Sequence, residues 1–236
     1  MRFPPAEAPA EERFLITKYG LDVVAGVLLA AVALSVLAWV ASDARVLRIG
    51  VTFLAVLAVA FTLYFFRDPD RRTPAGDQLI IAPADGTVVQ MMQVEDTEYL
   101  HGPALQISIF MSPLNVHVNR FPINGTVGFF RHVEGEFLVA FDDKSSSRNE
   151  RTLIGIERGS VRLLFKQIAG FVARRIVADV KVGDPTRAGE RFGMIKFGSR
   201  VDVLIPPECE VRVINGQKTV AGETVLAVLP QTGARP

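Results

Sequence analysis

The sequence contains a single cysteine, Cys209, and only three histidines among its 236 residues. One thiol excludes an intrachain disulfide framework and is typical of a reducing compartment; with no base beside it, we interpret Cys209 as structural. The histidines are scattered and form no recognisable cluster of metal ligands with the cysteine. We therefore expect no metal site, and we expect His101 to be a turn residue and His132 to lie on the surface.

An excess of charge of either sign is also missing. The chain has 26 basic and 25 acidic side chains and a formal net charge of +1. Nucleic-acid-binding domains usually carry a clear basic footprint, so this balance argues against nucleic acid as a partner. Apolar residues are abundant instead: they make up 49% of the sequence, and the mean hydropathy of +0.29 is high for a soluble domain. This composition predicts a membrane-embedded portion.

The apolar excess is concentrated near the N-terminus. Residues 23–41 and 49–66 contain no charged side chain over 19 and 18 positions. As helices they would span about 27 to 29 Å, close to the hydrocarbon thickness of a bilayer. We interpret residues 21–66 as a membrane hairpin behind an N-terminal segment, 1–20. A signal peptide fits less well, because a second apolar run follows the first. A hairpin that dips into one leaflet remains an alternative.

Basic residues flank the hairpin unevenly. Three precede it and three follow it, whereas the connecting loop holds two. The positive-inside bias therefore predicts that both ends of the hairpin, and the domain over residues 67–236, face the cytoplasmic side of the cell membrane. Arg67, Arg71 and Arg72 come directly after the second apolar run. We interpret them as a topology anchor that can also gain from contact with anionic lipid.

After residue 73 the pattern changes to short β-branched runs separated by glycine or proline. Such runs are typical of strands in an all-β barrel or sandwich. We expect strands at 79–81, 87–89, 104–110, 116–119, 125–130, 152–157, 161–165, 175–180, 201–205, 211–214 and 224–229. Residues 67–236 are thus expected to form one mainly β domain, with ample chain for a single core.

Two segments of this domain, 179–190 and 214–225, resemble each other. Each is also similar to the glycine-containing turn, ending in Gly-Glu, of lipoyl and biotinyl carrier domains in the barrel-sandwich hybrid family. The resemblance covers the turns only. It implies a barrel-sandwich-hybrid-like fold, and it implies no function by itself.

The bond between Gly198 and Ser199 is the strongest candidate for chemistry. It lies between two strand-like runs, in the sequence Arg-Phe-Gly-Met-Ile-Lys-Phe-Gly-Ser-Arg. Glycine leaves its carbonyl unhindered and tolerates a strained backbone, and serine supplies a hydroxyl beside its own peptide bond. A Gly-Ser pair alone is ordinary turn material. The long flanking pattern is what favours self-cleavage here.

This pattern resembles the processing site of the phosphatidylserine decarboxylase proenzymes, specifically the short type whose cleavage sequence is Phe-Gly-Ser-Arg. Further matches to that family occur in order along the chain. They are Phe-Phe-Arg-Asp-Pro at 65–69, Asn-Glu-Arg at 149–151 and Gln-Ile-Ala-Gly at 167–170. The resemblance extends from about residue 64 to residue 226.

The resemblance implies an Asp-His-Ser triad. His117 matches the family's histidine and would act as a base or proton donor, and Asp85, in a Pro-Ala-Asp-Gly step, matches the aspartate that orients it. In the longer bacterial branch of the family, the positions of Asn115 and Arg120 hold an aspartate and a second histidine, so this chain departs there. We expect Asn115 to hydrogen-bond the substrate and Arg120 to contact a phosphate or carboxylate.

The resemblance also implies a cofactor made from the chain itself. Attack of the Ser199 hydroxyl on the Gly198 carbonyl, followed by β-elimination and hydrolysis, would leave a pyruvoyl group on residue 199. The products would be a β chain, 1–198, and an α chain, 199–236, held as a heterodimer, alone or in a higher oligomer. The ketone would form a Schiff base with phosphatidylserine in the membrane and accept the electrons released with carbon dioxide, giving phosphatidylethanolamine. Neither pyridoxal phosphate nor a metal is expected.

Two alternatives remain open. One is a decarboxylase of another phosphoserine lipid, such as archaetidylserine, because residues that bind the head group do not report the tail linkage. The other is a membrane-tethered carrier or binding module on the same scaffold. Such a module needs a modifiable lysine at a hairpin tip, and Lys181 and Lys218 lack the Met-Lys-Met or Asp-Lys-Ala context.

Overall fold

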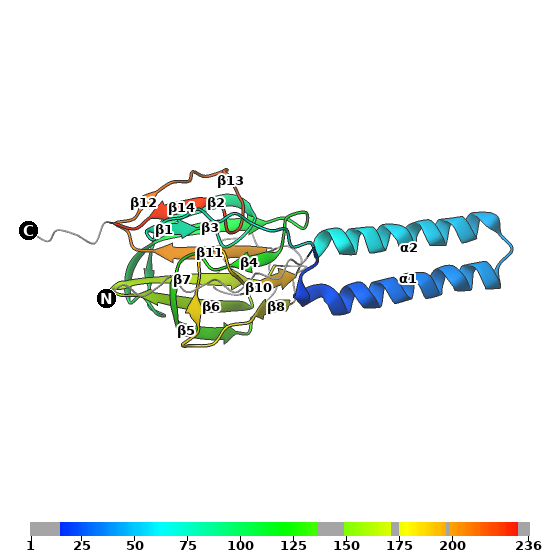
Figure 1. Cartoon of the computed structure of the whole chain (residues 1–236), viewed down its shortest axis with the longest axis horizontal. Coiled ribbons are helices and arrows are strands. Elements are labelled where there is room, and N and C mark those ends of the chain that lie inside the picture. The colour runs from blue at the N-terminus through cyan, green and yellow to red at the C-terminus, as the bar shows by residue number, and fades with distance from the viewer. Residues whose placement is uncertain (1–14, 136–148, 171–174, 197–198, 231–236) are drawn as a thin grey trace, which may run out of the picture. The chain divides into compact units, whose positions relative to one another are not determined.

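The computed structural model describes residues 15–135, 149–170, 175–196 and 199–230. The chain divides into two compact units, Met1–Asp70 and Arg71–Pro236. Within the described residues, the first unit holds the long helices and the second holds the strands (Figure 1).

A helical hairpin forms the first unit. A short 3-10 turn, η1 (Lys18–Gly20), leads into α1 (Leu21–Ala41), and α2 (Arg45–Phe65) runs back beside it (Figure 1). Across the hairpin, Trp39 Nε1 donates a hydrogen bond to Thr52 Oγ1 at 3.3 Å. Both helices are long and apolar enough to cross a membrane. The predicted N-terminal apolar hairpin is therefore confirmed.

The second unit is built from antiparallel strands. Among the described residues, an eight-stranded sheet has the order β13-β2-β3-β11-β7-β6-β5-β9, and two three-stranded sheets have the orders β1-β14-β12 and β4-β10-β8. The large sheet curls into a half-barrel, which confirms the predicted mainly β class. The strands are β1 (Leu79–Ile81), β2 (Gly86–Asp96), β3 (Gly102–Met111), β4 (Val118–Arg120), β5 (Gly125–Val133), β6 (Arg151–Arg158), β7 (Val161–Ile168), β8 (Arg175–Ala178), β9 (Pro185–Thr186), β10 (Arg191–Lys196), β11 (Ser199–Ile205), β12 (Glu210–Val211), β13 (Lys218–Thr219) and β14 (Val225–Val228).

Strand β11 lies in the middle of the large sheet, between β3 and β7 (Figure 1). All seven of its residues are buried. Because side chains alternate across a strand, Val201, Val203 and Ile205 share one face and belong to the main core. Leu204 points to the other face, where it packs in a second cluster with Tyr99 and Leu164. Both faces of β11 are therefore covered, which explains why Val203, Leu204 and Ile205 are consecutive apolar residues at the end of the strand.

The second unit also contains an internal repeat. Residues 82–88 and 121–127 share the pattern Pro-x-Asp/Asn-Gly-Thr-Val. Residues 183–190 and 216–223 each contain two glycines six positions apart, followed by glutamate. All four glycines have a positive φ, between 78° and 96°, which glycine adopts without the penalty that a Cβ imposes. The two similar turns seen in the sequence therefore belong to a larger structural duplication.

Each copy of the repeat is held by the same hydrogen bonds. The backbone N–H groups of Gly183 and Gly216 donate to the carbonyls of Val127 and Val88, at 2.8 and 2.7 Å. The other matching bonds are Gly189 N to Phe121 O (2.8 Å) with Gly222 N to Ala82 O (2.9 Å), and Thr186 Oγ1 to Ile123 O (2.9 Å) with Thr219 Oγ1 to Ala84 O (3.0 Å). The copies share one backbone scaffold, so functional differences between them must come from their side chains.

The strand prediction located most of the described strands but not the full extent of each one. Each expected range overlaps a strand, although β2 continues to Asp96, well beyond the expected end at residue 89. The list of expected strands omitted β10, which was noted only as a strand-like run before Gly198, and it omitted the two-residue strands β9 and β13. Two residues are too few for an alternating pattern, and these strands depend on the repeat for their place at the sheet edges.

Candidate functional site

Ser199 is the first residue of β11, and its side chain is fully buried. It pairs with Met111 at the end of β3, and its Oγ donates to Met111 Sδ at 3.3 Å. A thioether is a weak acceptor, so this contact holds the hydroxyl only loosely. Gly198, the other half of the predicted cleavage site, lies outside the described residues.

A chain of buried amides and hydroxyls extends from Met111 into the sheet. Asn119 Nδ2 lies 3.8 Å from Met111 Sδ, and Asn119 Oδ1 accepts from Gln167 Nε2 at 2.8 Å. Gln167 Oε1 in turn accepts from Thr152 Oγ1 at 2.7 Å. All of these groups are buried, and the bonds give each amide a defined orientation. Gln167 was noticed in the Gln-Ile-Ala-Gly match, whereas nothing in the sequence joined Asn119 and Thr152 to it.

His117 is fully buried just before β4. Its Nδ1 lies 2.9 Å from the carbonyl oxygen of Asn115. A carbonyl only accepts, so Nδ1 carries the proton in this pair and Nε2 is the basic nitrogen of the neutral ring. The His117 carbonyl accepts from the N–H of Ile195 in β10, at 3.3 Å. The histidine is therefore fixed against the strand that leads to the Gly198–Ser199 bond.

Asp85 is held by two donors. Arg71 Nη2 lies 3.0 Å from Oδ1 and 2.8 Å from Oδ2, and Ala221 N–H donates to Oδ1 at 2.7 Å. The Arg71 and Asp85 side chains are only 14% and 13% exposed. Within the described residues, Asp85 makes no hydrogen bond to His117, and Ser199 makes none to His117. The hydrogen bonds of the described residues thus do not join the three candidates to one another, and the Asn115 carbonyl occupies the orienting position expected for Asp85.

The internal repeat separates two roles of Asp85. In the other copy its counterpart is Asn124, whose Oδ1 accepts from Ala188 N–H at 2.8 Å, as Asp85 Oδ1 does from Ala221. An amide oxygen therefore suffices for the structural bond. Within the part of the chain that the structure describes, the carboxylate charge and its arginine partner occur in one copy only. Arg71 was interpreted from the sequence as part of a basic anchor after the hairpin, and nothing in the sequence paired it with Asp85.

Asn115 and Arg120 are both engaged in the fold. Asn115 is half-buried, and its Oδ1 accepts from Ser112 N–H at 2.9 Å, which closes a turn before His117. Arg120 is buried, and its Nη1 donates to the carbonyl of Gly189 at 2.8 Å. Both residues therefore have a structural role, because each makes a hydrogen bond to a backbone group. Their expected contact with a substrate stays a prediction.

The remaining candidate residues are His101, His132 and Cys209. His101 is exposed with a φ of 54°, which fits the expected turn residue, and His132 is exposed, 3.6 Å from Glu150. Burial raises the pKa of the Cys209 thiol to about 11, with a smaller contribution from Glu208. A thiol with this pKa is almost wholly protonated near neutral pH and is a poor nucleophile. Among the described residues no group of three or more His, Cys, Asp or Glu side chains could hold a metal ion.

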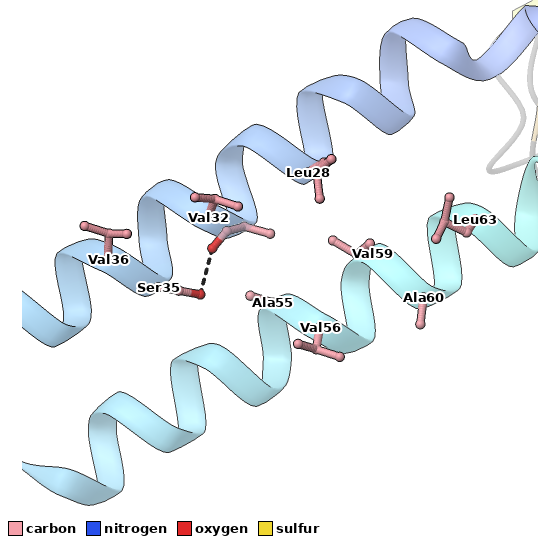
Figure 2. A pocket seen from close by; sticks show the side chains of 10 residues that line it. Leu28, Val32, Ser35, Val36, Ala55, Val56, Val59, Ala60 and Leu63 are labelled. Atoms are coloured by element: carbon pink, nitrogen blue, oxygen red, sulfur yellow. Dashed lines mark hydrogen bonds between the residues drawn. The ribbon is translucent and has the colours of Figure 1, made fainter.

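A separate apolar groove lies between α1 and α2 in the first unit (Figure 2). Its volume is about 420 Å³, and its lining includes Leu28, Val32 and Val59. The one polar lining side chain, Ser35, donates back to the carbonyl of Ala31 at 2.7 Å. Because its only hydroxyl is used within α1, the groove offers no group for chemistry.

Comparison with known proteins identifies a family for this chain. The family model for phosphatidylserine decarboxylase matches residues 58–227. A phosphatidylserine decarboxylase proenzyme of Chlorobium phaeovibrioides is 47% identical over 218 residues, which cover 92% of this chain and 98% of the relative. The proenzyme of Chlorobium phaeobacteroides is 52% identical over 168 residues (71% and 79%), and that of Salinibacter ruber is 50% identical over 196 residues (81% and 85%).

Proposed function

This chain belongs to the phosphatidylserine decarboxylase family, and we propose on that basis that Ser199 cuts its own peptide bond and becomes the pyruvoyl group of a membrane-bound decarboxylase. The protein is a carboxy-lyase proenzyme that converts phosphatidylserine to phosphatidylethanolamine. The observation that carries the proposal is the position of Ser199, buried at the start of a central strand. The carrier module and the ether-lipid decarboxylase have no comparable support.

Self-cleavage requires one nucleophile and one base. Ser199 Oγ adds to the Gly198 carbonyl carbon, and the bond to the Ser199 nitrogen breaks, so that the amide becomes an ester. Removal of the proton from Cα of residue 199 then expels the Gly198 carboxylate. The resulting enamine takes up a proton on Cβ and becomes an imine. Water then replaces its nitrogen, which leaves as ammonia, so that residue 199 carries a ketone and a methyl group. A base is needed for the hydroxyl proton and again for the Cα proton.

His117 is the residue proposed for this task. Its Nδ1 proton is directed at the Asn115 carbonyl, which leaves the Nε2 lone pair as the basic site. The hydroxyl of Ser199 has to turn from Met111 toward the base, and the loss of a weak hydrogen bond to sulfur opposes this rotation little. Asp85 is proposed to act on the site through its charge and through Arg71, since it makes no hydrogen bond to His117 within the described chain.

The surroundings of residue 199 fit an uncharged keto group. The site is buried, and the neighbouring Met111 and Val201 are apolar, so conversion of the serine to a pyruvoyl group, with a ketone oxygen in place of its nitrogen and a methyl group in place of its side chain, leaves no charge without a partner. Once formed, a pyruvoyl group supplies an electron sink for the pair released with carbon dioxide. Burial of the site also keeps water away from the departing carboxylate.

The substrate is proposed to be held by the loop before β4. Asn115 uses Oδ1 within its turn, which leaves its Nδ2 hydrogens for a carboxylate or phosphate of the head group. Arg120 remains a candidate for the same anionic groups. The two apolar helices support attachment to the cell membrane, and the flanking arginines and lysine support a cytoplasmic face for the second unit.

Reductive trapping tests this function. Treatment of the purified protein with borohydride and phosphatidylserine should attach the substrate amine to residue 199 of a 38-residue α chain, the length of 199–236. Peptide mapping of the adduct locates the bond. Label on a lysine, or activity that a chelator abolishes and added metal restores, would overturn the assignment even if decarboxylation were observed.

A further inference from the structure

Arg200, the residue after Ser199, has an unusual environment for an arginine. Its side chain is only 2% exposed, and Asp202, with which it pairs, is fully buried. Arg200 Nε donates to Asp202 Oδ1 at 2.6 Å. Removing two charges from water is costly, so a buried pair of this kind needs further hydrogen bonds to be tolerated.

The further bonds connect Arg200 to two other strands. Its Nη2 donates to Ser108 Oγ in β3 at 2.8 Å and to Gln90 Oε1 in β2 at 3.0 Å. Gln90 and Ser108 are themselves partners in the β2–β3 ladder, and Asp202 lies opposite Ser108 in the β3–β11 ladder. One planar guanidinium therefore ties three adjacent strands together, a task that suits the rigid fork of arginine.

The backbone pairing changes at the same residue. Among the described residues, Ser199 is paired with Met111 on one side only, whereas Arg200 is paired with Phe110 in β3 and Ile168 in β7. Arg200 is thus the first residue of β11 held on both sides. Because side chains alternate, its guanidinium lies on the face of the sheet opposite to Ser199 and does not enter the reacting site.

Cleavage changes what holds residue 199, and this step rests on the proposed function. In the uncut chain, peptide bonds join residue 199 to the residue before it and to the residue after it. After cleavage it has no residue before it, and the ketone has replaced its N–H, so one backbone donor is lost. Chain ends without such restraints fray readily. Arg200 would then be the first residue of the α chain that the sheet holds firmly.

We propose that Arg200 is a positioning residue that keeps the pyruvoyl end of the α chain seated after cleavage. It does so by clamping that end to Ser108 and Gln90, which belong to the β chain. In the uncut chain, the Gly198–Ser199 peptide bond restrains residue 199. After cleavage, the hydrogen bonds of Arg200 to the β chain provide this restraint instead. Since Arg200 does not touch the substrate, its loss should lower kcat and leave KM little changed.

The test compares Arg200→Lys with a matched control in the same chain, Arg212→Lys. Arg212 also pairs with an acid two residues away, donating to Glu210 at 2.9 Å, but both side chains are exposed. A lysine at 200 keeps the charge and cannot span three acceptors. In the full-length protein, Arg200→Lys should be cleaved as completely as wild type, with kcat lowered about tenfold or more, as small misplacements of reacting groups cause.

A second readout reports the position of the ketone directly. Hydroxylamine converts an accessible ketone to an oxime with loss of water, and the mass of the α chain gives the rate. Without substrate, the Arg200→Lys ketone should react several-fold faster than that of wild type or Arg212→Lys. If Arg200→Lys fails to fold, the double variant R200M/D202L removes both charges together and should show the same two changes.

The outcomes separate this inference from the proposed function. A wild-type protein that stays uncut, or has no ketone, contradicts the proposed function. A cleaved Arg200→Lys protein with wild-type kcat and oxime rate overturns the positioning role alone. So does an uncut chain that accumulates while each cut molecule turns over normally, because Arg200 would then act before cleavage.

Discussion

Replacing Asp85 by asparagine should separate the fold of this protein from its chemistry. The internal repeat provides the reason, because Asn124 occupies the matching place in the other copy and accepts the same backbone hydrogen bond. Asp85→Asn keeps an oxygen for Ala221 N–H. It removes the negative charge that faces Arg71, and the proposed reaction depends on that charge. We therefore expect a folded protein that remains uncut.

The size of the effect follows from the contacts. In Asp85→Asn, Arg71 keeps a neutral acceptor but loses its ion pair in a site where both side chains are about one-eighth exposed, and we expect a loss of about 1–2 kcal/mol. Asp85→Ala also leaves the buried Ala221 N–H without an acceptor, which adds about 1–3 kcal/mol. In a domain of this size, 1 kcal/mol corresponds to roughly 2–4 °C in Tm. Asp85→Ala should therefore melt several degrees below Asp85→Asn.

The assay combines thermal unfolding of the detergent-solubilised full chain with a denaturing gel that separates uncut from cut protein. Asn124→Ala serves as the control, since it breaks the equivalent structural bond at an exposed position of the other copy. It should lower Tm slightly and leave cleavage intact. The reasoning fails if Asp85→Asn is cut at the wild-type rate, or if it is as unstable as Asp85→Ala.

Three other changes have defined outcomes. His117→Ala should accumulate uncut chain with little change in secondary structure by circular dichroism, and normal cutting would assign the base to another residue. A chain truncated to residues 67–236 should leave the membrane fraction yet still self-cleave; retention after a high-salt wash would place an attachment surface in the β domain. Burial raises the Cys209 pKa to about 11, so iodoacetamide at pH 7.5 should label Cys209 in native protein at least tenfold more slowly than in urea-unfolded protein. The rate of labelling of native protein should increase as the pH approaches 11. Equal rates for native and unfolded protein would contradict the buried position of Cys209.

The sequence was sufficient for the general architecture because its signals are local. Long uncharged runs predicted the hairpin, and β-branched runs between glycines predicted most strands of the β domain. Cleavage chemistry was inferred from a family pattern around Ser199, and its residue roles remain predictions. Each of these inferences depends on neighbours in the chain, which a sequence shows directly.

The network around the site could not be predicted, because its contacts join distant residues. Arg200 and Asp202 read as two charges in an apolar strand, and nothing local shows that β2 and β3 supply further acceptors. Arg71 had a sufficient explanation as a residue flanking a membrane helix, which concealed its pairing with Asp85. The Asn115 carbonyl that fixes the His117 tautomer is a backbone group. Every residue has such a carbonyl, so the sequence alone does not predict this hydrogen bond.

The intact mass of the purified protein tests the central claim most directly. The account predicts that wild type consists of two fragments that part between Gly198 and Ser199, with the C-terminal fragment carrying a ketone in place of the serine amine and hydroxyl. Ser199→Ala, prepared in the same way, should remain one full-length chain without activity. A wild-type mass of one intact chain in an active preparation, or a Ser199→Ala protein split at the same bond, would contradict self-cleavage by Ser199.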